Sequence, residues 1–438
     1  MSVEANTLNS DAHRRVVYQR ATDILKLNDR GSYTVPTHGL YPFQWNWDSC
    51  LVAIGQQQLD EKRAWTELNT LFDHQWDDGM VPHIIFHELD EGYFPGPDVW
   101  GTGRAVQTTG ITQPAVAGFA AALLHKRATD KALADDQARA LLTRIDRWHE
   151  WFYRCRDPEG TGLVAVIHPW ETGRDNSVDW DEALAAVPTE GLQPYQRRDL
   201  QHADATHRPT MAQYDGYISL VQHFRDLSWD NEVLHDASPF RMVDPGFNAI
   251  LIRACRELAI LAESLGDRDV ARRNHDRVAA GLQAIDSLWS DKHQQYLCFD
   301  RVIGRLVDSA SVAGLLAAFA PIPEARMQAL AARIDKLGSA VNYLVPSHDP
   351  ADDRYDGKRY WRGPAWLIIN YMIANGLEQG GCNVLARRIQ TASLKLIDKS
   401  GFAEYYDPQS GEPCGGSTFT WTAAMVMEFI QKPGKPLG

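Results

Sequence analysis

The sequence predicts an all-α protein that folds as a single (α/α)6 barrel over residues 1–438, with long loops forming a cleft at one end. Apolar residues recur at helical spacing in about a dozen segments, and most of these are joined by short turns that favour antiparallel neighbours. Strand-like runs are few and short, such as 296–299. A dozen helices can close as two concentric rings of six. An open α-solenoid is the alternative, but the sequence lacks the fixed-period repeat of a solenoid.

Apolar spacing and capping residues define the individual helices. An apolar stripe over Val16–Leu25 marks the first one, and Asp60 is placed to cap a helix that starts at residue 61. Pro114 lies one residue into a helix expected from residue 113, where proline is tolerated, and Gly266 separates two long helices. The predicted helices span 12–28, 47–59, 61–75, 113–127, 131–155, 212–228, 245–265, 268–289, 310–319, 323–336, 365–379, 381–398 and 418–430. The longer connections are 77–112, 156–211 and 337–364.

The composition is that of an ordinary globular protein. The formal net charge of −13 argues against a general affinity for nucleic acid or anionic membranes. No apolar run approaches the roughly 18 residues of a membrane span, and no signal peptide is visible. The six cysteines are scattered without a Cys-x-x-Cys pair, which predicts reduced thiols in a cytoplasmic protein. The sequence leaves open whether the chain forms a homo-oligomer.

The 14 tryptophans are unusual because many fall between predicted helices, next to Asp, Gln, Arg and Gly. A single such tryptophan most often fills the core or packs at a helix end. As a set they favour a carbohydrate site, because indole faces pack on the C–H faces of sugars and the indole N–H donates to hydroxyls. The tryptophans concerned are Trp45, Trp47, Trp100, Trp170, Trp180, Trp361 and Trp366.

The polar segment 168–177 is the strongest candidate for catalysis. It reads as a loop and brings a Trp, a Glu, an Arg and an Asp within a few residues. Two carboxyls are the usual machinery of glycoside cleavage, and we take Asp175 as the acid and Glu404, in segment 401–407, as its partner. Spacing does not decide between these and four other carboxyls: Asp48, Glu171, Asp181 and Glu182.

Other polar segments offer binding groups. Asp48 opens a helix near its predicted start, where Asp48 or Ser49 can cap it, and the string Trp45-Asn-Trp-Asp48 also suits a sugar subsite. His83 and His87 are four residues apart, but HExxH and further ligands are absent, so no metal and no other cofactor are predicted. His83 is then a hydroxyl donor or a structural histidine. Gln113 is expected at a helix start, either facing the cleft or solvated.

Two further segments follow the same pattern. Arg208 precedes Pro209 and Thr210 at a helix start, so it either presents its guanidinium to a carboxylate or lies on a solvated face. Segment 359–366 reads as a preformed wall; simple packing at a helix start explains Trp366 but not Tyr360 and Trp361.

Four of these strings in this order resemble family 63 of the glycoside hydrolases, and within it the bacterial mannosylglycerate and glucosylglycerate hydrolases. They are 45–48, 171–177, 360–364 and the segment around Glu404. The resemblance implies an (α/α)6 barrel and an inverting mechanism, with Asp175 as general acid and Glu404 as general base. It implies that the sugar lies among Trp45, Trp47, Asp48, His83, Trp170, Tyr360, Trp361 and Trp366. It implies that the glycerate carboxylate is held by Tyr41, Gln113, Arg208 and Tyr214.

One departure affects the segment after Asp175. Val178 stands where the family is expected to have proline, so a less constrained loop is expected there. The predicted function is inverting hydrolysis of an α-glycosidic bond in a small sugar–glycerate conjugate, with the two carboxyls ~6.5–9.5 Å apart. The alternatives are an α-glucosidase for a neutral disaccharide and a non-catalytic sugar-binding helical protein. The sequence does not distinguish glucose from mannose.

Overall fold

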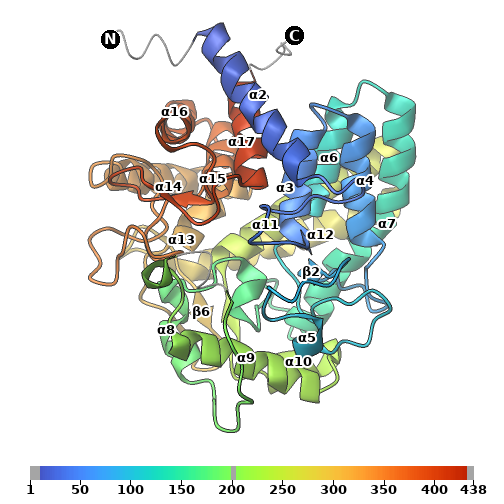
Figure 1. Cartoon of the computed structure of the whole chain (residues 1–438), viewed down its shortest axis with the longest axis vertical. Coiled ribbons are helices and arrows are strands. Elements are labelled where there is room, and N and C mark those ends of the chain that lie inside the picture. The colour runs from blue at the N-terminus through green and yellow to red at the C-terminus, as the bar shows by residue number, and fades with distance from the viewer. Residues whose placement is uncertain (1–9, 199–203, 432–438) are drawn as a thin grey trace.

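The computed structural model describes residues 10–198 and 204–431 and is predominantly helical (Figure 1). The longer helices are α2 (Asp11–Asn28), α3 (Asn46–Gln56), α4 (Glu61–Phe72), α6 (Ala117–Arg127), α7 (Lys131–Arg156), α9 (Met211–Asp226), α11 (Pro245–Leu265), α12 (Arg268–Ile285), α14 (Glu324–Leu337), α15 (Leu367–Gln379), α16 (Asn383–Ser400) and α17 (Thr420–Ile430). The short helices are α5 (Pro97–Trp100), α8 (Asp181–Ala185), α10 (Asn231–Ala237) and α13 (Val312–Leu316). Single 3-10 turns are η1 (Pro169–Thr172), η2 (Val178–Trp180), η4 (Ala205–His207), η5 (Asp286–Leu288) and η6 (Ala317–Phe319).

The strands of the described residues are all two residues long. They are β1 (Gln44–Trp45), β2 (Ile84–Ile85), β3 (Met242–Val243), β4 (Trp289–Ser290), β5 (Gln295–Tyr296), β6 (Phe299–Asp300), β7 (Arg305–Leu306), β8 (Tyr405–Tyr406) and β9 (Pro413–Cys414). All pair antiparallel, with Trp45 opposite Ile84 and Tyr405 opposite Cys414. The prediction of few, short strands is confirmed. Each of the predicted helices has a counterpart, whereas α5, α8 and α10 were not predicted.

Side-chain caps explain why several helix boundaries could be predicted. The Asp60 side chain accepts the Arg63 N–H and starts α4, as expected. Asp244 accepts two N–H groups at the start of α11, Pro245 occupies the first helical position, and Gly266 ends the helix with a φ of 82°. These contacts satisfy N–H groups that the first turn of a helix leaves without an intrahelical partner.

One predicted helix start and one predicted cap were wrong. The helix expected from residue 113 begins at Ala117, because a residue before proline avoids the helical conformation and the Thr112 hydroxyl donates to the Val81 carbonyl instead of capping. The helix expected near Asp48 begins at Asn46, whose side-chain amide donates to the carbonyls of Val81 and Pro82. Asp48 therefore lies inside the first turn and does not cap it.

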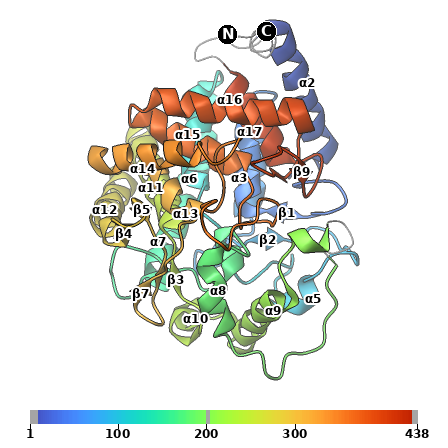
Figure 2. The ribbon, with the colours of Figure 1, turned by 90° about the vertical axis from the view of Figure 1, so that its left-hand side faces the viewer.

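Six helices form the interior. α3 packs against α6, α6 against α11, α11 against α13, α13 against α15, α15 against α17, and α17 returns to α3. Every residue of α3 is buried, as expected of a helix surrounded by other helices. α2, α4, α7, α12 and α16 pack outside these helices and bury only one stripe each. In both ribbon views α2 and α16 lie at one end, and α5, α8, α9 and α10 lie at the other (Figure 2).

Within the described residues, we find no helix with the length and apolarity needed to cross a bilayer.

Candidate active site

An open cavity, about 970 Å³ when the solvent at its mouth is included, lies beside the starts of α3 and α17. It is lined by side chains from separate parts of the chain, and both Asp175 and Glu404 are among them. The other predicted site residues that line it are Tyr41, Trp45, Trp47, Asp48, His83, Gln113, Trp170, Arg208, Tyr214 and Tyr360.

The N-termini of α3 and α17 are directed toward this cavity. Trp47 and Asp48 in the first turn of α3, and Trp421 in the first turn of α17, line it. Asp244 and Ser311, the N-caps of α11 and α13, hold the loop that carries Asp175. Because helix N-termini carry partial positive charge, this arrangement favours the carboxylates gathered at the site.

Glu404 immediately precedes β8 and is 1% exposed. Its Oε1 accepts hydrogen bonds from the hydroxyls of Tyr41, at 3.2 Å, and Tyr360, at 3.1 Å. Its Oε2 accepts the backbone N–H of Gly416 at 3.2 Å. Burial raises the pKa of Glu404, while the Arg208 guanidinium and these three donors oppose that rise. The carboxyl is thus held in one orientation in a site that is largely closed to water.

Gly415 allows this arrangement because it has no side chain. Its φ is +70°, and a Cβ built on it would lie 2.1 Å from the Glu404 Oε2. Any other residue at this position would displace the carboxyl as well as strain the backbone.

Arg208 lies against the same tyrosines. Its Cζ is 4.3 Å from the centre of the Tyr360 ring, and its Nη1 donates to the Tyr41 hydroxyl at 3.4 Å. Thr210 and Gln213 form a capping box at the start of α9, which fixes the chain two residues after Arg208. The structure therefore places the predicted carboxylate-binding arginine beside Glu404.

The loop that carries Asp175 is fixed through its neighbours. The Tyr217 hydroxyl donates to the Asp175 carbonyl at 2.7 Å, and the Trp180 indole donates to the Arg174 carbonyl at 2.8 Å. The Asn176 side-chain oxygen accepts the Trp361 N–H at 2.9 Å. Asp175 itself is half-buried at the cavity wall.

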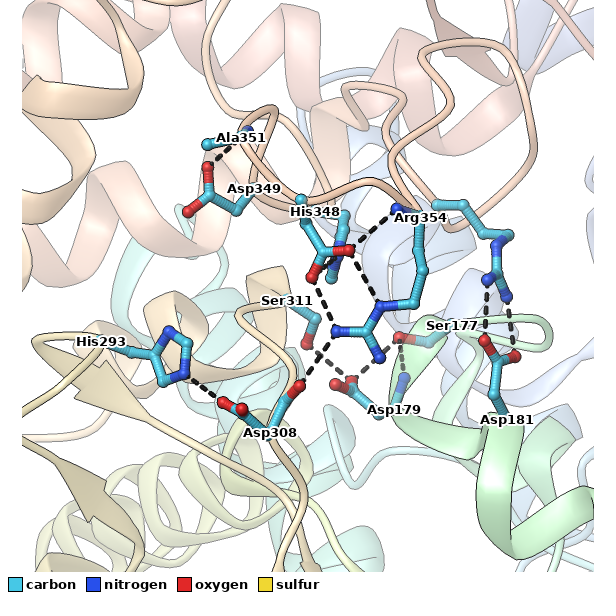
Figure 3. A network of polar contacts seen from close by, with 12 residues as sticks. Ser177, Asp179, Asp181, His293, Asp308, Ser311, His348, Asp349, Ala351 and Arg354 are labelled. Carbon is cyan, nitrogen blue, oxygen red and sulfur yellow. Dashed lines mark hydrogen bonds and ion pairs between the residues drawn. The ribbon is translucent and has the colours of Figure 1, made fainter.

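A buried ion cluster adds to this support. Arg174 donates to Asp179 at 2.9 Å and to Asp244 at 2.8 Å. The Asp179 Oδ2 also accepts the hydroxyls of Ser177 and Ser311 (Figure 3). Buried charges are stable when they are paired and hydrogen-bonded in this way.

The residue Val178, where proline was expected, is buried at the start of η2. The Arg174 cluster and the Asn176–Trp361 bond fix the loop on both sides of it. The prediction of a less constrained loop is therefore not supported: tertiary contacts supply the constraint.

The competing carboxyls have structural partners. Glu171 is buried and pairs with Arg156 at 3.1 Å. Asp181 pairs with Arg362 at 2.7 Å, and Glu182 pairs with Arg305 at the surface. Only Asp48 among the four also lines the cavity.

Asp48 and His83 present polar atoms without a hydrogen-bond partner among the described residues. These atoms are the Oδ1 of Asp48 and the Nδ1 of His83, and both side chains are buried. Burial raises the pKa of Asp48, and the charge of Glu404 raises it further. Burial lowers the pKa of His83 to about 3, with a smaller contribution from His168, so the imidazole is neutral. Both residues also line the cavity, where polar side chains can bind ligand hydroxyls.

Aromatic side chains form the rest of the wall. Trp47 is held by its backbone N–H, which donates to the Gln113 Oε1 at 3.1 Å, and its ring meets the edge of Trp421 at 5.7 Å. Gln113 is buried, so the solvated alternative was wrong.

The sequence did not identify several cavity residues. Trp421 and Phe419 flank Thr420 at the start of α17, as Trp45 and Trp47 flank Asn46 at the start of α3, so this repeated pattern was an available signal. The lining residues that were not predicted include Leu40, Tyr93, Phe94, Arg198, Phe419 and Trp421.

Trp361 and Trp366 were predicted as part of the sugar wall, but the structure places them behind it. Their rings stack at 3.9 Å and 2°, both are buried, and neither is among the residues lining the cavity. The Trp366 indole donates to the Tyr360 carbonyl at 3.2 Å. The pair supports Tyr360, which alone of the three reaches the cavity.

The described residues contain one cluster that could hold a metal ion: Glu159, His235 and Asp236. None of the three lines the cavity, and Glu159 and His235 already pair with Arg301 and Asp236.

Comparison with known proteins identifies the family. The family model described as "Mannosylglycerate hydrolase MGH1-like glycoside hydrolase domain" matches residues 41–422. Mannosylglycerate hydrolase MGH1 of Selaginella moellendorffii is 46% identical over 93% of this chain and 84% of its own length. The mannosylglycerate hydrolase of Thermus thermophilus is 43% identical over 93% of this chain and 99% of its own.

A solved structure agrees with these matches. The crystal structure of a family 63 mannosylglycerate hydrolase from Thermus thermophilus, in complex with Tris and D-glycerate, superposes with a TM-score of 0.92. It shares 42% identity and covers 95% of this chain and 100% of that chain. The family predicted from the sequence motifs is confirmed. The chain belongs to the MGH1-like glycoside hydrolases of family 63.

Proposed function

We propose that this glycoside hydrolase cleaves the α-glycosidic bond of mannosylglycerate or glucosylglycerate with inversion and releases the free sugar and glycerate. One observation carries the proposal: Asp175 and Glu404 line the same aromatic cavity, and that cavity also contains Arg208. Relatives of 43–46% identity that are named mannosylglycerate hydrolases support the choice of substrate.

In the proposed mechanism, Asp175 is the general acid and Glu404 the general base. Glu404 takes a proton from a water molecule, whose oxygen attacks the anomeric carbon from the face opposite the glycerate. Asp175 gives its proton to the glycerate oxygen as the glycosidic bond breaks. An inverting enzyme needs ~6.5–9.5 Å between the carboxyls to leave room for that water. The hydrogen bonds that Tyr41, Tyr360 and Gly416 donate to Glu404 fix its carboxylate, which supports Glu404 as the group that orients the attacking water.

The polar groups of the cavity would divide between sugar and glycerate. Asp48 and His83 line the cavity and would bind sugar hydroxyls, and apolar sugar faces would pack on the cavity's indoles. We assign the sugar to Trp45, Trp47, Asp48, His83, Trp170 and Tyr360, and the glycerate to Tyr41, Gln113, Arg208 and Tyr214. Trp361 and Trp366 would act through Tyr360 and not by contact with the sugar.

We further propose that the helices form one (α/α)6 barrel and a single domain. The closed sequence of contacts from α3 back to α17, with α2, α4, α7, α12 and α16 packed outside, supports an inner ring of six helices surrounded by an outer layer. A cytoplasmic location stays a prediction, and the sequence leaves the oligomeric state open.

Reducing-sugar release from a panel of α-mannosides and α-glucosides, with and without a glycerate group, tests the proposal. We expect activity on the glycerate conjugates, and Arg208→Ala should reduce it far more for these than for neutral disaccharides. Preference for a neutral disaccharide would support the second candidate, a small α-glucosidase. If no compound of the panel releases reducing sugar, the proposed substrate class is wrong.

A further inference from the structure

Arg208 contacts both tyrosines that hold the proposed base. Its guanidinium lies over the Tyr360 ring, with Cζ 4.3 Å from the ring centre, and donates to the Tyr41 hydroxyl at 3.4 Å. Both hydroxyls donate to the Glu404 Oε1. Arg208 is also 7% exposed, so its charge acts in a site from which water is largely removed. One tyrosine hydroxyl, that of Tyr41, thus joins Arg208 directly to Glu404.

We propose that Arg208 couples the charge of the leaving group to the ionisation of Glu404. With the glycerate position empty, the guanidinium holds Glu404 in its charged form. When the carboxylate of the substrate pairs with Arg208, that influence is neutralised and Glu404 becomes a stronger base. This inference rests on the proposed function, because it needs a glycerate carboxylate at Arg208.

Among the described groups around Glu404, Arg208 is the cation that can influence the ionisation of this carboxyl. The Tyr405 phenol and the Gly416 N–H lie on the same hairpin as Glu404. Tyr41, near the start of the chain, and Asp48, in α3, also face Glu404. Tyr360 faces it from the segment before α15. Asp48 adds negative charge, and the tyrosines are neutral because burial raises the pKa of each phenol. Among the described residues that line the cavity, the arginines are Arg198 and Arg208, and Arg208 is the one that contacts these tyrosines.

The expected effect on pH dependence has a definite sign. Burial raises the pKa of Glu404, and Arg208 is the first of the groups that lower it. Catalysis needs ionised Glu404, so activity falls as the pH drops through this pKa. Neutralising Arg208 raises the pKa, and the acidic limb of the pH profile moves to higher pH. The gain is a stronger base at the moment when substrate is present.

Hydrolysis of α-mannosyl fluoride and α-glucosyl fluoride, with and without saturating D-glycerate, tests the coupling. Fluoride leaves with little need of a general acid, so the acidic limb of kcat/KM reports on Glu404. Because fluoride is small, D-glycerate can bind beside the sugar. We expect D-glycerate to move the acidic limb of the wild-type enzyme to higher pH, with a roughly tenfold loss of kcat/KM on that limb, as for loss of a nearby opposite charge.

Two variants sharpen the result. Arg208→Met without D-glycerate should already show the displaced limb, and D-glycerate should move it no further. Arg208→Lys keeps the positive charge, so its acidic limb should stay close to that of the wild type. The comparison of wild type with and without D-glycerate is complete even if a variant fails to fold.

Calorimetric titration with D-glycerate separates the possible failures. If D-glycerate binds and the limb does not move, the coupling is wrong and the proposed function stands. If D-glycerate does not bind, or neither fluoride is hydrolysed, the proposed function fails and the coupling fails with it.

Discussion

The guanidinium of Arg362 forms two hydrogen bonds with the carboxylate of Asp181, at 2.8 and 2.7 Å. Arg362 follows Tyr360, which contacts Glu404, and Asp181 lies in the segment after Asp175. Two segments far apart in the chain are therefore joined by one ion pair with both oxygens engaged. A bidentate arginine–carboxylate pair fixes orientation as well as distance.

We expect Arg362→Lys to lower kcat about 10- to 100-fold with little change in KM, because small displacements of catalytic groups are costly to the reaction and less costly to binding. Lysine keeps the charge but cannot form the bidentate pair. Steady-state kinetics on the preferred glycerate conjugate measure both constants. The matched control is Arg305→Lys, which alters the exposed pair with Glu182 in the same region. Equal effects of the two substitutions would show that the Arg362 pair has no special part in positioning.

Removing a tyrosine hydroxyl that donates to Glu404 should shift the pH profile of activity. The Tyr360 hydroxyl donates to the carboxylate and so stabilises its charged form. Tyr360→Phe should raise the pKa of Glu404 and move the acidic limb of kcat/KM to higher pH, with a roughly three- to tenfold loss on that limb. Tyr405→Phe is the control, because the Tyr405 hydroxyl is buried without a hydrogen-bond partner among the described residues. An unchanged limb in Tyr360→Phe would contradict this description of the base.

Gly415→Ala should damage turnover more than it damages stability. The added methyl would lie 2.1 Å from the Glu404 Oε2, so the carboxyl must move, and we expect kcat to fall ~10²-fold. The positive φ strains the alanine backbone and lowers the free energy of unfolding by roughly 1–2 kcal/mol.

The matched control for Gly415 is Gly266→Ala. Gly266 also has a positive φ, of +82°, but a Cβ there meets nothing within 4 Å. Thermal unfolding and kcat should both be measured. Similar losses of kcat in the two variants would mean that contact with Glu404 is unimportant.

The roles of Asp175 and Glu404 can be distinguished by substituting each residue and measuring activity on substrates with different leaving groups. Asp175→Asn should lower kcat on a glycerate conjugate by ~10²–10⁴-fold, yet retain most activity on a glycosyl fluoride, which needs little proton donation. Glu404→Gln should lose activity on both, because each reaction requires an activated water. Kinetics on the two substrates give the comparison. Loss of fluoride hydrolysis in Asp175→Asn with retention in Glu404→Gln would reverse the assignment.

Local signals explain what the sequence could predict. Asp60 and Gly266 act within one turn of their own helix ends, so capping rules predicted the helices they bound. The resemblance to the family predicted that Asp175 and Glu404 share one site, and both line the same cavity. Their spacing in the sequence alone did not establish this.

The errors came from contacts between distant segments. Trp361 and Trp366 read as a sugar-binding wall, but their mutual stacking and the Asn176 bond to the Trp361 backbone turn them away from the cavity. The Arg174 cluster likewise joins residues that lie up to 137 positions apart, so no local pattern indicated that it fixes the loop around Val178.

The anomeric form of the sugar first released from a glycerate conjugate is the decisive observation, and proton NMR during the first turnovers records it. If Glu404 activates a water on the face opposite to the group protonated by Asp175, the β-anomer of the sugar appears first and the α-anomer follows by mutarotation. Initial release of the α-anomer would contradict this arrangement of the two carboxyls.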